Sequence, residues 1–307
     1  MKILVFGGAG FIGHHLVNHL QHNYDVCVYD NFSIFGVKHE QQIQNIIQNR
    51  IKKWYNVDTV NGSILDSSLV KDTFDNFQPE IVVNLASYPR VNFVDKYPTV
   101  SARSMIEGMI NTFHYDIQKY IHISSSNVYG NYQDNANEST FCSPINLYGS
   151  LKLTQEHLLK AESKKTNLNY IILRPICVFG NNDLSDRLIS KFIKSAVNNQ
   201  DLFYAQDTIT DITYVEDIVN AIELSITSKI ENETFNISSE HRLTIKQISE
   251  IIKEHFNSTS NIIPVNREKY FPNHGALLID KAKNTLGYER KFDFFEALKK
   301  IDPNTIF

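Results

Sequence analysis

The stretch Lys2–Leu16, KILVFGGAGFIGHHL, joins an apolar run, a glycine-rich turn and a helix-like segment. Gly8, Gly10 and Gly13 fit the spacing G-x-G-x-x-G, and Gly7 opens a second one, G-x-x-G-x-x-G. Such glycines allow a tight turn, close approach of the backbone to a pyrophosphate, and close packing of the helix on the strand. The amides at the helix start can then meet phosphate oxygens. The stretch predicts a strand–turn–helix unit that binds a dinucleotide.

The acid that ends the second apolar run selects the kind of dinucleotide. The run VCVYD ends in Asp30, at the spacing of about 20 residues after the glycines that the motif requires. A carboxylate there accepts hydrogen bonds from the adenosine ribose and repels a 2′-phosphate. No arginine follows closely, and the nearest basic residue is Lys38. The alternative is a glycine-rich turn beside a surface aspartate, but the combined pattern favours NAD over NADP.

Apolar strand-like runs alternate with helical patterns along the first part of the chain. The expected strands are Lys2–Phe6, Asp25–Asp30, Val57–Val60, Ile81–Leu85, Tyr120–Ser124 and Tyr170–Leu173. The helical patterns between them include Ile12–His22, Ser67–Phe77 and Val94–Gln118. Continuous Val, Ile and Leu in strands separated by helices indicate a parallel sheet buried on both faces. The expected fold class is α/β, a Rossmann-type doubly wound parallel sheet.

The alternation loosens after about residue 176, which indicates a second unit. The patterns there are strands at Leu202–Ala205 and Glu233–Ile237 and helices at Val215–Thr227 and Thr244–Phe256. We expect an NAD-binding domain over residues 1–176, with parts of about 205–240 folding back onto it. A smaller C-terminal substrate-binding α/β lobe is expected over residues 177–307.

The composition is that of a soluble globular protein. The chain has 307 residues, of which 42% are hydrophobic and 21% charged, and a net charge of −4. Scattered basic residues argue against a nucleic-acid partner, and no apolar stretch approaches the about 18 residues of a membrane span. Cys27, Cys142 and Cys177 lack paired spacing, so neither a metal site nor a disulfide framework is expected. These features fit a cytoplasmic protein.

A serine cluster and a Tyr–Lys pair follow the fifth strand. The cluster SSSNVYG begins at Ser124, at a strand end where open α/β sheets bind ligands. Tyr148 and Lys152, in INLYGSLKLTQE, are four residues apart and share one helix face. A phenol with a pKa of about 10 is a poor base at neutral pH. A nearby ammonium favours the phenolate, by up to about 4 kcal/mol at about 4 Å. The alternative to a catalytic role is that the serines only cap a helix or form a turn. In that case Tyr148 and Lys152 would only lie on a solvated helix face.

With its motifs in this order, the chain resembles the extended short-chain dehydrogenase/reductases, within them the nucleotide-sugar epimerase/dehydratase family (UDP-glucose 4-epimerase-like). The resemblance runs from GGAGFIG to about FNIS and includes NLAS, SSSNVYG, YGSLK and LRPICVFG. It implies that Tyr148 takes a proton from a sugar hydroxyl and that Ser125 shares that proton. It also implies that Lys152 hydrogen-bonds the nicotinamide ribose.

The resemblance further implies two sets of binding residues. The cofactor set is Gly7, Gly10, Phe11, Ile12, Gly13, Asp30, Asn31, Ser63, Ile64, Leu85, Ala86, Ser87, Ser124, Tyr148, Lys152 and Pro175. The substrate set is Ser125, Ser126, Tyr148, Cys177, Arg187 and Thr210. No metal is implied. A homodimer is implied, formed through the helical stretches at about 94–118 and 147–163.

Several positions depart from the family's pattern. The acidic pair that follows the catalytic hydroxyl residue in 4,6-dehydratases is Ser126-Asn127 here, which disfavours dehydration. Ser63 stands where an adenine-contacting Asp is usual, and Cys177 where a substrate-contacting Asn is usual.

The clearest departure is Thr210 in TDITYVED, which replaces the arginine that grips the substrate's diphosphate. Its loss removes a bidentate phosphate clamp. Either Arg187 or Arg90 substitutes for it, or the substrate is unusual. The alternative for Arg187 is an exposed helix residue with no such role.

The expected activity is that of an NAD-dependent nucleotide-sugar epimerase, acting at C4 through a 4-keto intermediate. A nucleotide-sugar 4-dehydrogenase or 4-keto-sugar reductase is the alternative, since it differs only in whether the keto sugar is released. A further alternative is a non-catalytic NAD-binding regulator. The intact Ser125, Tyr148 and Lys152 argue against a regulator, and the missing arginine argues for one.

Overall fold

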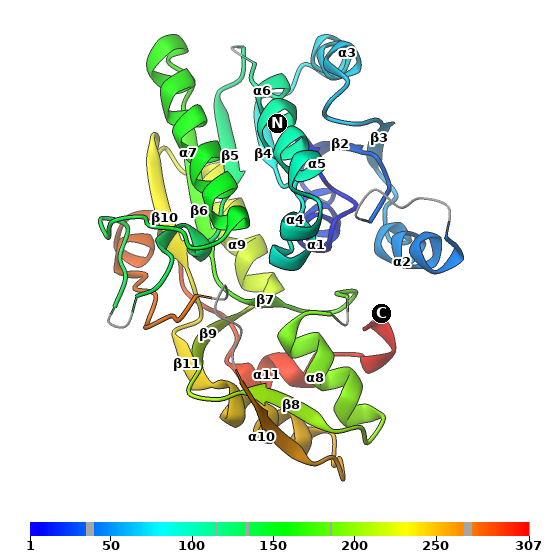
Figure 1. Ribbon diagram of the computed structural model, residues 1–307. Coiled ribbons are helices and arrows are strands. Elements are labelled where there is room, and N and C mark those ends of the chain that lie inside the picture. Colours follow the sequence, from blue (N-terminus) through cyan, green and yellow to red (C-terminus); the bar gives the residue numbers. More distant parts are fainter. Residues whose placement is uncertain (35–39, 115, 133–134, 185, 267–271, 307) are drawn as a thin grey trace.

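A parallel sheet of seven strands organises the structure, in the order β10-β6-β5-β4-β1-β2-β3 (Figure 1). The strands are β1 (Lys2–Phe6), β2 (Asp25–Asp30), β3 (Val57–Asn61), β4 (Ile81–Asn84), β5 (Lys119–Ile123), β6 (Tyr170–Pro175) and β10 (Glu233–Ile237). This computed structural model describes residues 1–34, 40–114, 116–132, 135–184, 186–266 and 272–306. The order of β1 to β6 is that of the Rossmann fold, so the expected fold class is confirmed.

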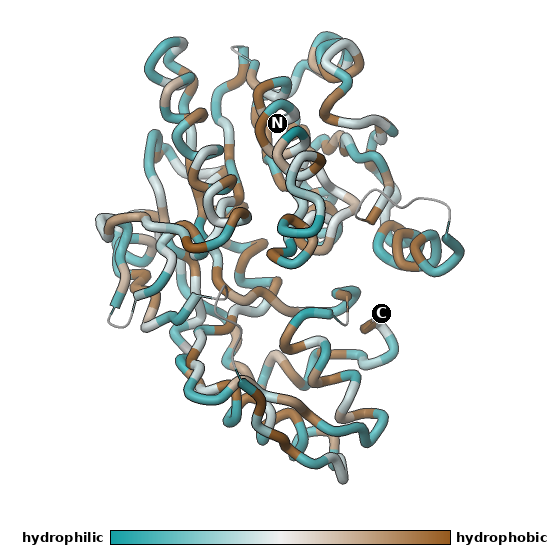
Figure 2. The backbone as a smooth tube through the Cα atoms, in the orientation of Figure 1, coloured by the Kyte–Doolittle hydropathy of each residue, from teal (hydrophilic) through white to brown (hydrophobic). Residues whose placement is uncertain are grey.

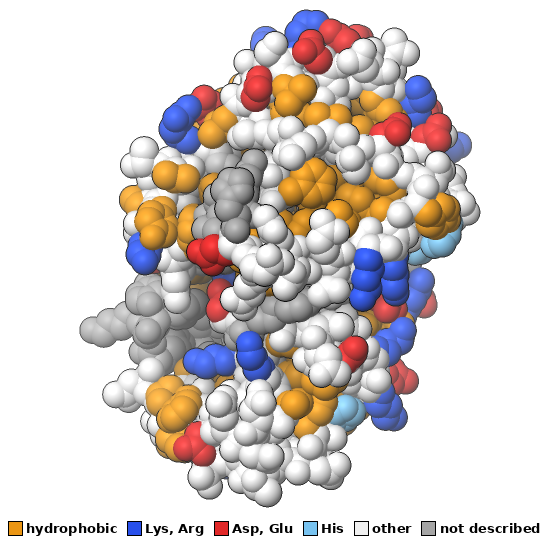
Figure 3. Space-filling model, turned by 90° about the vertical axis from the view of Figure 1, so that its right-hand side faces the viewer, with side chains coloured by type: hydrophobic (Ala, Val, Ile, Leu, Met, Phe, Trp, Pro, Cys, Tyr) orange, Lys and Arg blue, Asp and Glu red, His pale blue; other side chains and the backbone are white. Residues whose placement is uncertain are grey.

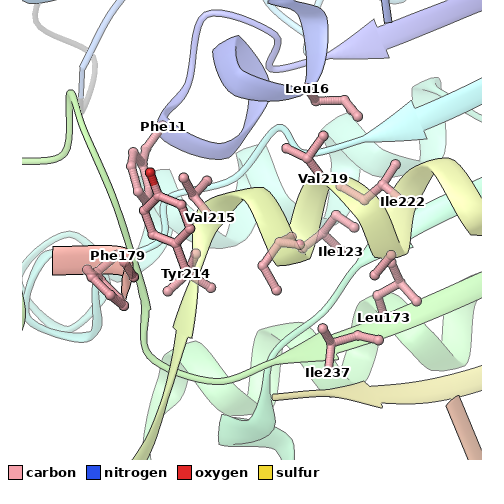
Figure 4. Close-up of a cluster of buried hydrophobic side chains, with 14 of the residues drawn as sticks. Phe11, Leu16, Ile123, Leu173, Phe179, Tyr214, Val215, Val219, Ile222 and Ile237 are labelled. Carbon is pink, nitrogen blue, oxygen red and sulfur yellow. The ribbon is translucent and has the colours of Figure 1, made fainter. Parts of the chain in front are cut away.

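Alternating side chains of the sheet strands fill two apolar layers. Ile3 and Val5 of β1 enter one buried cluster, whereas Leu4 and Phe6 enter another on the opposite face. The first cluster is covered by α1 (Phe11–Leu20) and α9 (Val215–Thr227), the second by α3 (Ser67–Phe77), α6 (Gly108–Asn111) and α7 (Leu147–Thr166). Figure 4 shows side chains of α1, α9 and the sheet meeting in the first cluster. The covering helices alternate between hydrophobic and hydrophilic residues along their length (Figure 2).

The prediction of a single helix over Val94–Gln118 is wrong. The chain forms α4 (Val91–Lys96) and α5 (Pro98–Ala102), then a π-helical segment at Arg103–Glu107, and ends in α6. Pro98 begins α5 because a proline has no N–H to donate and its ring clashes with the preceding turn. The segment after α6 leads into β5 without further helix among its described residues.

A smaller C-terminal lobe lies below the large sheet in Figure 1. It holds two small sheets, ordered β11-β9-β7 and β12-β8. Its elements are β7 (Val178–Phe179), α8 (Leu188–Val197), β8 (Leu202–Ala205), β9 (Ile209–Tyr214), β11 (His241–Thr244), α10 (Ile245–His255), β12 (Ile262–Val265) and α11 (Phe294–Lys299). The chain leaves this lobe between β9 and β11, where α9 packs against α1 and β10 pairs with β6.

Local sequence explains where the lobe's main helix begins. Thr244 precedes α10, and its side chain accepts a hydrogen bond from the backbone of Gln247, whose own side chain accepts one from Thr244. This capping box satisfies two amides that a helix start would leave unpaired. In the part of the chain that the structure describes, no helix has the length and apolar character to cross a membrane.

Candidate active site

A cleft of about 1040 Å³ extends from the glycine loop, past the ends of β4 and β5, into the C-terminal lobe. Apolar side chains gather in a hollow on the face shown in Figure 3. Every residue of the two expected binding sets lines this cleft: Gly7, Gly10, Phe11, Ile12, Gly13, Asp30, Asn31, Ser63, Ile64, Leu85, Ala86, Ser87, Ser124, Ser125, Ser126, Tyr148, Lys152, Pro175, Cys177, Arg187 and Thr210. The fold therefore brings together residues that are distant in sequence.

The glycine loop follows the second of the two spacings. Gly7 has φ +80°, and a Cβ there would lie 2.7 Å from the backbone nitrogen of Ala86. A Cβ on Gly13 would lie 2.2 Å from the carbonyl oxygen of Gly7. Gly8 serves packing instead, since its Cβ would meet the Val28 side chain. Gly10 precedes α1 in extended conformation without a side-chain cap, so the first amides of α1 are available to a phosphate.

Asp30 lies at the end of β2 beside this loop. Its Oδ2 accepts the Ala9 N–H at 2.9 Å and its Oδ1 accepts the Phe32 N–H at 2.7 Å, which orients the carboxylate. Burial raises the pKa of Asp30, against these hydrogen bonds and the charge of Arg50. Arg50 donates to the carbonyl oxygens of Ala9 and Asn182 and is only 4% exposed, so its guanidinium is already engaged. Lys38 lies outside the described residues.

The Tyr–Lys helix, α7, starts at the cleft. The Asn146 side chain caps it by accepting the Gly149 N–H at 2.8 Å, which places Tyr148 in the first turn. Lys152, one turn later, donates to the carbonyl oxygen of Ile123 at 2.8 Å, at the end of β5. This hydrogen bond joins the first turns of α7 to the end of β5 at the cleft.

Ser125 completes the cluster with Tyr148 and Lys152. Its hydroxyl acts on the Tyr148 phenol and lowers the pKa of that group, against the effect of burial. The Ser125 Oγ also accepts two hydrogen bonds from Asn127, from the backbone at 3.2 Å and from the side-chain amide at 3.1 Å. Because both Asn127 groups donate, the hydroxyl hydrogen of Ser125 is left to be shared with the phenol.

The electrostatics of the cluster differ from the sequence expectation, which had Lys152 lowering the pKa of the phenol. Burial raises the pKa of Tyr148, and the positive charges that oppose this rise belong to Arg187 and Arg90. Burial also lowers the pKa of Lys152 to about 7, with the Glu156 carboxylate acting in the opposite direction. The expectation was incomplete because it counted the charge of Lys152 but not the cost of removing that charge from water.

At the substrate end of the cleft, Thr210 offers no cation. Its hydroxyl donates to the carbonyl oxygen of Asp211 at 2.9 Å. Cys177 has φ +37°, and burial raises the pKa of its thiol to about 12, so it stays a neutral thiol at physiological pH. The cleft therefore carries no charge at Thr210 or at Cys177, the two positions that depart from the family's pattern.

Arg187 precedes α8 and faces the cleft. Its Nη1 donates to the carbonyl oxygen of Val178 at 3.2 Å, its Nε lies 3.6 Å from Asp183, and its guanidinium lies 5.4 Å from the Phe11 ring. Within the described part of the chain that is one hydrogen bond for a group with five N–H donors. Arg90 also lines the cleft, but its Nε is held by Asp186 at 2.9 Å.

Sequence reasoning missed much of the C-terminal lining. The lining residues it did not name there include Phe203, Ala205, Thr208, Val265, Asn266, Pro272 and His274. They come from short strands and their flanks, where no local sequence pattern separates a binding residue from a packing one. Glu156, in contrast, could have been found, because it follows Lys152 at the spacing of one helical turn.

A Rossmann sheet with a glycine loop, an acid after β2 and a Ser–Tyr–Lys cluster defines a short-chain dehydrogenase/reductase. The sequence profile of the NAD dependent epimerase/dehydratase family matches residues 3–238, and the chain belongs to this family. The resemblance stated from the sequence is thereby confirmed, and the chain is an enzyme of the nucleotide-sugar epimerase/dehydratase group.

Individual relatives include both epimerases and dehydratases. A UDP-glucose 4-epimerase from Thermotoga maritima has a TM-score of 0.88 and 28% identity, with 98% of this chain and 97% of that chain covered. A UDP-glucuronic acid 4-epimerase from Bacillus cereus has a TM-score of 0.88 and 26% identity, with 98% and 97% covered. A dTDP-D-glucose 4,6-dehydratase from Dictyostelium discoideum is 28% identical over 79% of this chain, which spans 59% of that relative.

NAD is the cofactor of this family, and the residues present fit it. Gly7, Gly10 and Gly13 allow the loop's backbone to pack closely on itself and on Ala86, directly before the uncapped start of α1. The Asp30 carboxylate lines the same cleft and is held there by the Ala9 and Phe32 amides. The expectation of NAD is confirmed.

Replacing Asp30 with Ala should narrow the preference for NAD over NADP, because the charge that repels a 2′-phosphate is lost. Burial raises the pKa of Asp30, so this carboxylate gains its proton at a higher pH than an exposed aspartate does. The preference of the unmodified protein should therefore weaken as the pH falls. Titration of both dinucleotides over a pH series measures both effects. Equal or tighter binding of NADP by the unmodified protein at neutral pH would contradict this prediction.

Proposed function

We propose that this enzyme is a nucleotide-sugar 4-epimerase that works through a 4-keto intermediate. The observation that carries the proposal is the Ser125–Tyr148 hydroxyl pair at the cleft, followed by Ser126 and Asn127 in place of the acid pair used for dehydration. The two solved relatives named above, which are 4-epimerases, support it. A panel of UDP-, GDP-, dTDP- and CDP-sugars assayed with NAD tests it, and epimerised product is the expected result.

Each residue of the cluster has a separate task in this proposal. Tyr148 takes the proton of the sugar's 4-hydroxyl and returns it to the 4-keto oxygen after the sugar has turned over. Ser125 shares that proton through its hydroxyl, and Lys152 orients the nicotinamide ribose and supplies positive charge. NAD, when bound, supplies the hydride acceptor at C4 and the donor for the return step.

We also propose that Arg187 replaces the guanidinium that Thr210 lacks. It lines the cleft, and most of its N–H donors have no hydrogen bond within the described residues, so it can bind a diphosphate oxygen. Ser126, Cys177 and Thr210 then contribute shape and neutral contacts. Arg90 is the weaker candidate because Asp186 holds it.

Replacing Arg187 with Gln should raise the KM for the nucleotide sugar by about 10-fold or more, as for loss of a charge-assisted contact. The NAD affinity should change far less. Arg242→Gln is the matched control, since Arg242 is an exposed arginine that does not belong to the cleft lining. An unchanged KM in Arg187→Gln would assign the diphosphate to another group.

A net 4-dehydrogenase or 4-keto-sugar reductase uses the same cluster and stays the alternative. It would consume NAD or NADH in proportion to product, whereas an epimerase regenerates NAD in each cycle. A silent NAD-binding regulator, favoured only by the missing arginine at Thr210, would turn over none of the panel sugars. The panel assay therefore separates all three functions.

The remaining organisation is proposed from the resemblance. Residues 1–176 with parts of about 205–240 would form the NAD-binding domain, and residues 177–307 the substrate-binding lobe. A cytoplasmic homodimer would form through α5, α6 and α7, where Val100 and Ile110 are 52% and 47% exposed. Sedimentation measurements test the oligomeric state.

A further inference from the structure

A buried ion pair lies beneath the Ser125–Tyr148–Lys152 cluster. Arg174 of β6 donates to Glu156 of α7 from Nε at 2.9 Å and from Nη2 at 2.6 Å. Glu156 is 0% exposed and Arg174 is 3% exposed. Glu156 also accepts the Ser124 hydroxyl at 2.6 Å. Two charges are thus held out of water directly next to the residues proposed for catalysis, which is costly unless the pair stays intact.

Two routes connect this pair to Lys152. Glu156 follows Lys152 by four residues on α7, so both side chains lie on one helix face. Ser124, which binds Glu156, directly follows Ile123, whose carbonyl oxygen accepts the Lys152 ammonium at 2.8 Å. The position of the Glu156 carboxylate therefore fixes both the charge near Lys152 and the strand end to which Lys152 is bound.

Other titratable groups near Lys152 do not replace this carboxylate. Tyr148 lies one turn earlier on α7, and His122 lies on β5. Burial lowers the pKa of His122 well below its ordinary value, and the Lys152 charge adds to that, so His122 is neutral. Lys160, on α7, lies 3.8 Å from Glu156 on the side away from Lys152 in sequence. Glu156 is the negative charge that acts on Lys152.

We propose that the Glu156–Arg174 pair tunes the charge of Lys152: Glu156 opposes the loss of the ammonium proton that burial favours, and Arg174 limits this effect of Glu156. The proposal rests on the roles assigned above to Tyr148 and Lys152. Glu156 and Arg174 are positioning residues, since neither touches substrate or cofactor. The hydrogen bonds of Glu156 to Arg174 and to Ser124 fix the position of its carboxylate, so the effect of the pair on Lys152 follows from the fold itself.

Opposite changes follow from removing either charge. Without the Glu156 charge, Arg174 stays behind as a buried cation, and Lys152 releases its proton at a lower pH. Without the Arg174 charge, Glu156 attracts the ammonium more strongly, and Lys152 keeps its proton to a higher pH. A purely structural role would not move the titration of Lys152 in opposite directions.

The test is the titration midpoint of Lys152 in the NAD-loaded protein, followed by NMR of carbon-13-labelled lysine and assigned by the signal lost in Lys152→Met. Glu156→Gln should lower the midpoint and Arg174→Gln should raise it, each by about one to two pH units, the size expected for a unit charge nearby. The double variant should lie near the unmodified protein. Glu162→Gln, a carboxylate on the same helix paired with Lys165, is the control and should not shift it.

Breaking a buried ion pair destabilises a protein, so a milder variant is included. Lys160→Gln removes a partly exposed cation next to Glu156 and should raise the midpoint slightly. The proposal is overturned if the Lys152 midpoint does not move in Glu156→Gln and Arg174→Gln, or if it moves in the same direction in both. If these two variants do not fold, an unchanged Lys152 midpoint in Lys160→Gln overturns the proposal. The NMR titration needs no substrate. If the Lys152 midpoint shifts in opposite directions in the two variants but the enzyme turns over no sugar, only the proposed function is contradicted.

Discussion

Replacing Tyr148 with Phe should lower turnover by about 10²–10⁴-fold, the typical contribution of a positioned acid–base group. The phenol oxygen is the only heavy atom lost, and it is the proton acceptor in the proposed mechanism. The ring stays packed in the buried cluster with Val94, Met105 and Leu151, so the fold should persist. Steady-state kinetics should show the loss in kcat, while fluorescence titration should show NAD binding close to normal.

Tyr88→Phe is the matched control for this variant. Tyr88 lines the same cleft, stacks on Phe93 and packs against the apolar cluster that contains Tyr148, so the change removes the same hydroxyl from a neighbouring ring while Tyr148 stays intact. Its turnover should stay within a few-fold of the unmodified enzyme. A Tyr148→Phe enzyme with near-normal turnover would remove the proposed base and defeat the epimerase and the dehydrogenase alternatives together.

Replacing Lys152 with Met should damage both turnover and cofactor affinity. The change removes the ammonium that is anchored to the Ile123 carbonyl and with it the proposed ribose contact. Turnover should fall by about 10²–10³-fold, as for loss of a preorganised electrostatic group. NAD affinity should fall as well, which distinguishes this variant from Tyr148→Phe. Kinetics and NAD titration on the same preparation measure both effects.

Lys191→Met is the control for the lysine variant, because Lys191 lines the cleft from the C-terminal lobe. It should leave NAD affinity unchanged. If Lys152→Met bound NAD as tightly as the unmodified enzyme does, Lys152 would have no ribose contact, and its role would be confined to the phenol.

The sequence predicted the parts of the site that depend on local chemistry. The spacing of Gly7, Gly10 and Gly13 requires close backbone approaches, and the structure has them at 2.2–3.0 Å from where a Cβ would stand. The spacing of Tyr148 and Lys152 requires a shared helix face, and α7 provides it. Patterns of this kind are set by neighbours along the chain, so they can be recognised without knowing the tertiary structure.

The parts that were missed depend on contacts between distant segments. Arg50 is buried because it bonds Ala9 and Asn182, and nothing in its own helix indicates this. The low pKa of Lys152, about 7, results from burial under the completed fold. The break at Pro98 was visible in the sequence, but the helical pattern on either side concealed it. The burial of Arg50 and of Lys152 can be recognised only in the tertiary structure, whereas the break at Pro98 could have been predicted from the proline itself.

The most direct test of the central claim follows a deuterium label at C4 of the nucleotide sugar that is turned over. An epimerase of the proposed kind returns the label to the same carbon on the opposite face. The product should therefore retain deuterium at C4, with no net formation of NADH. Loss of the label to free cofactor, with NADH accumulating in step with a keto sugar, would contradict the claim and assign the enzyme to the dehydrogenases.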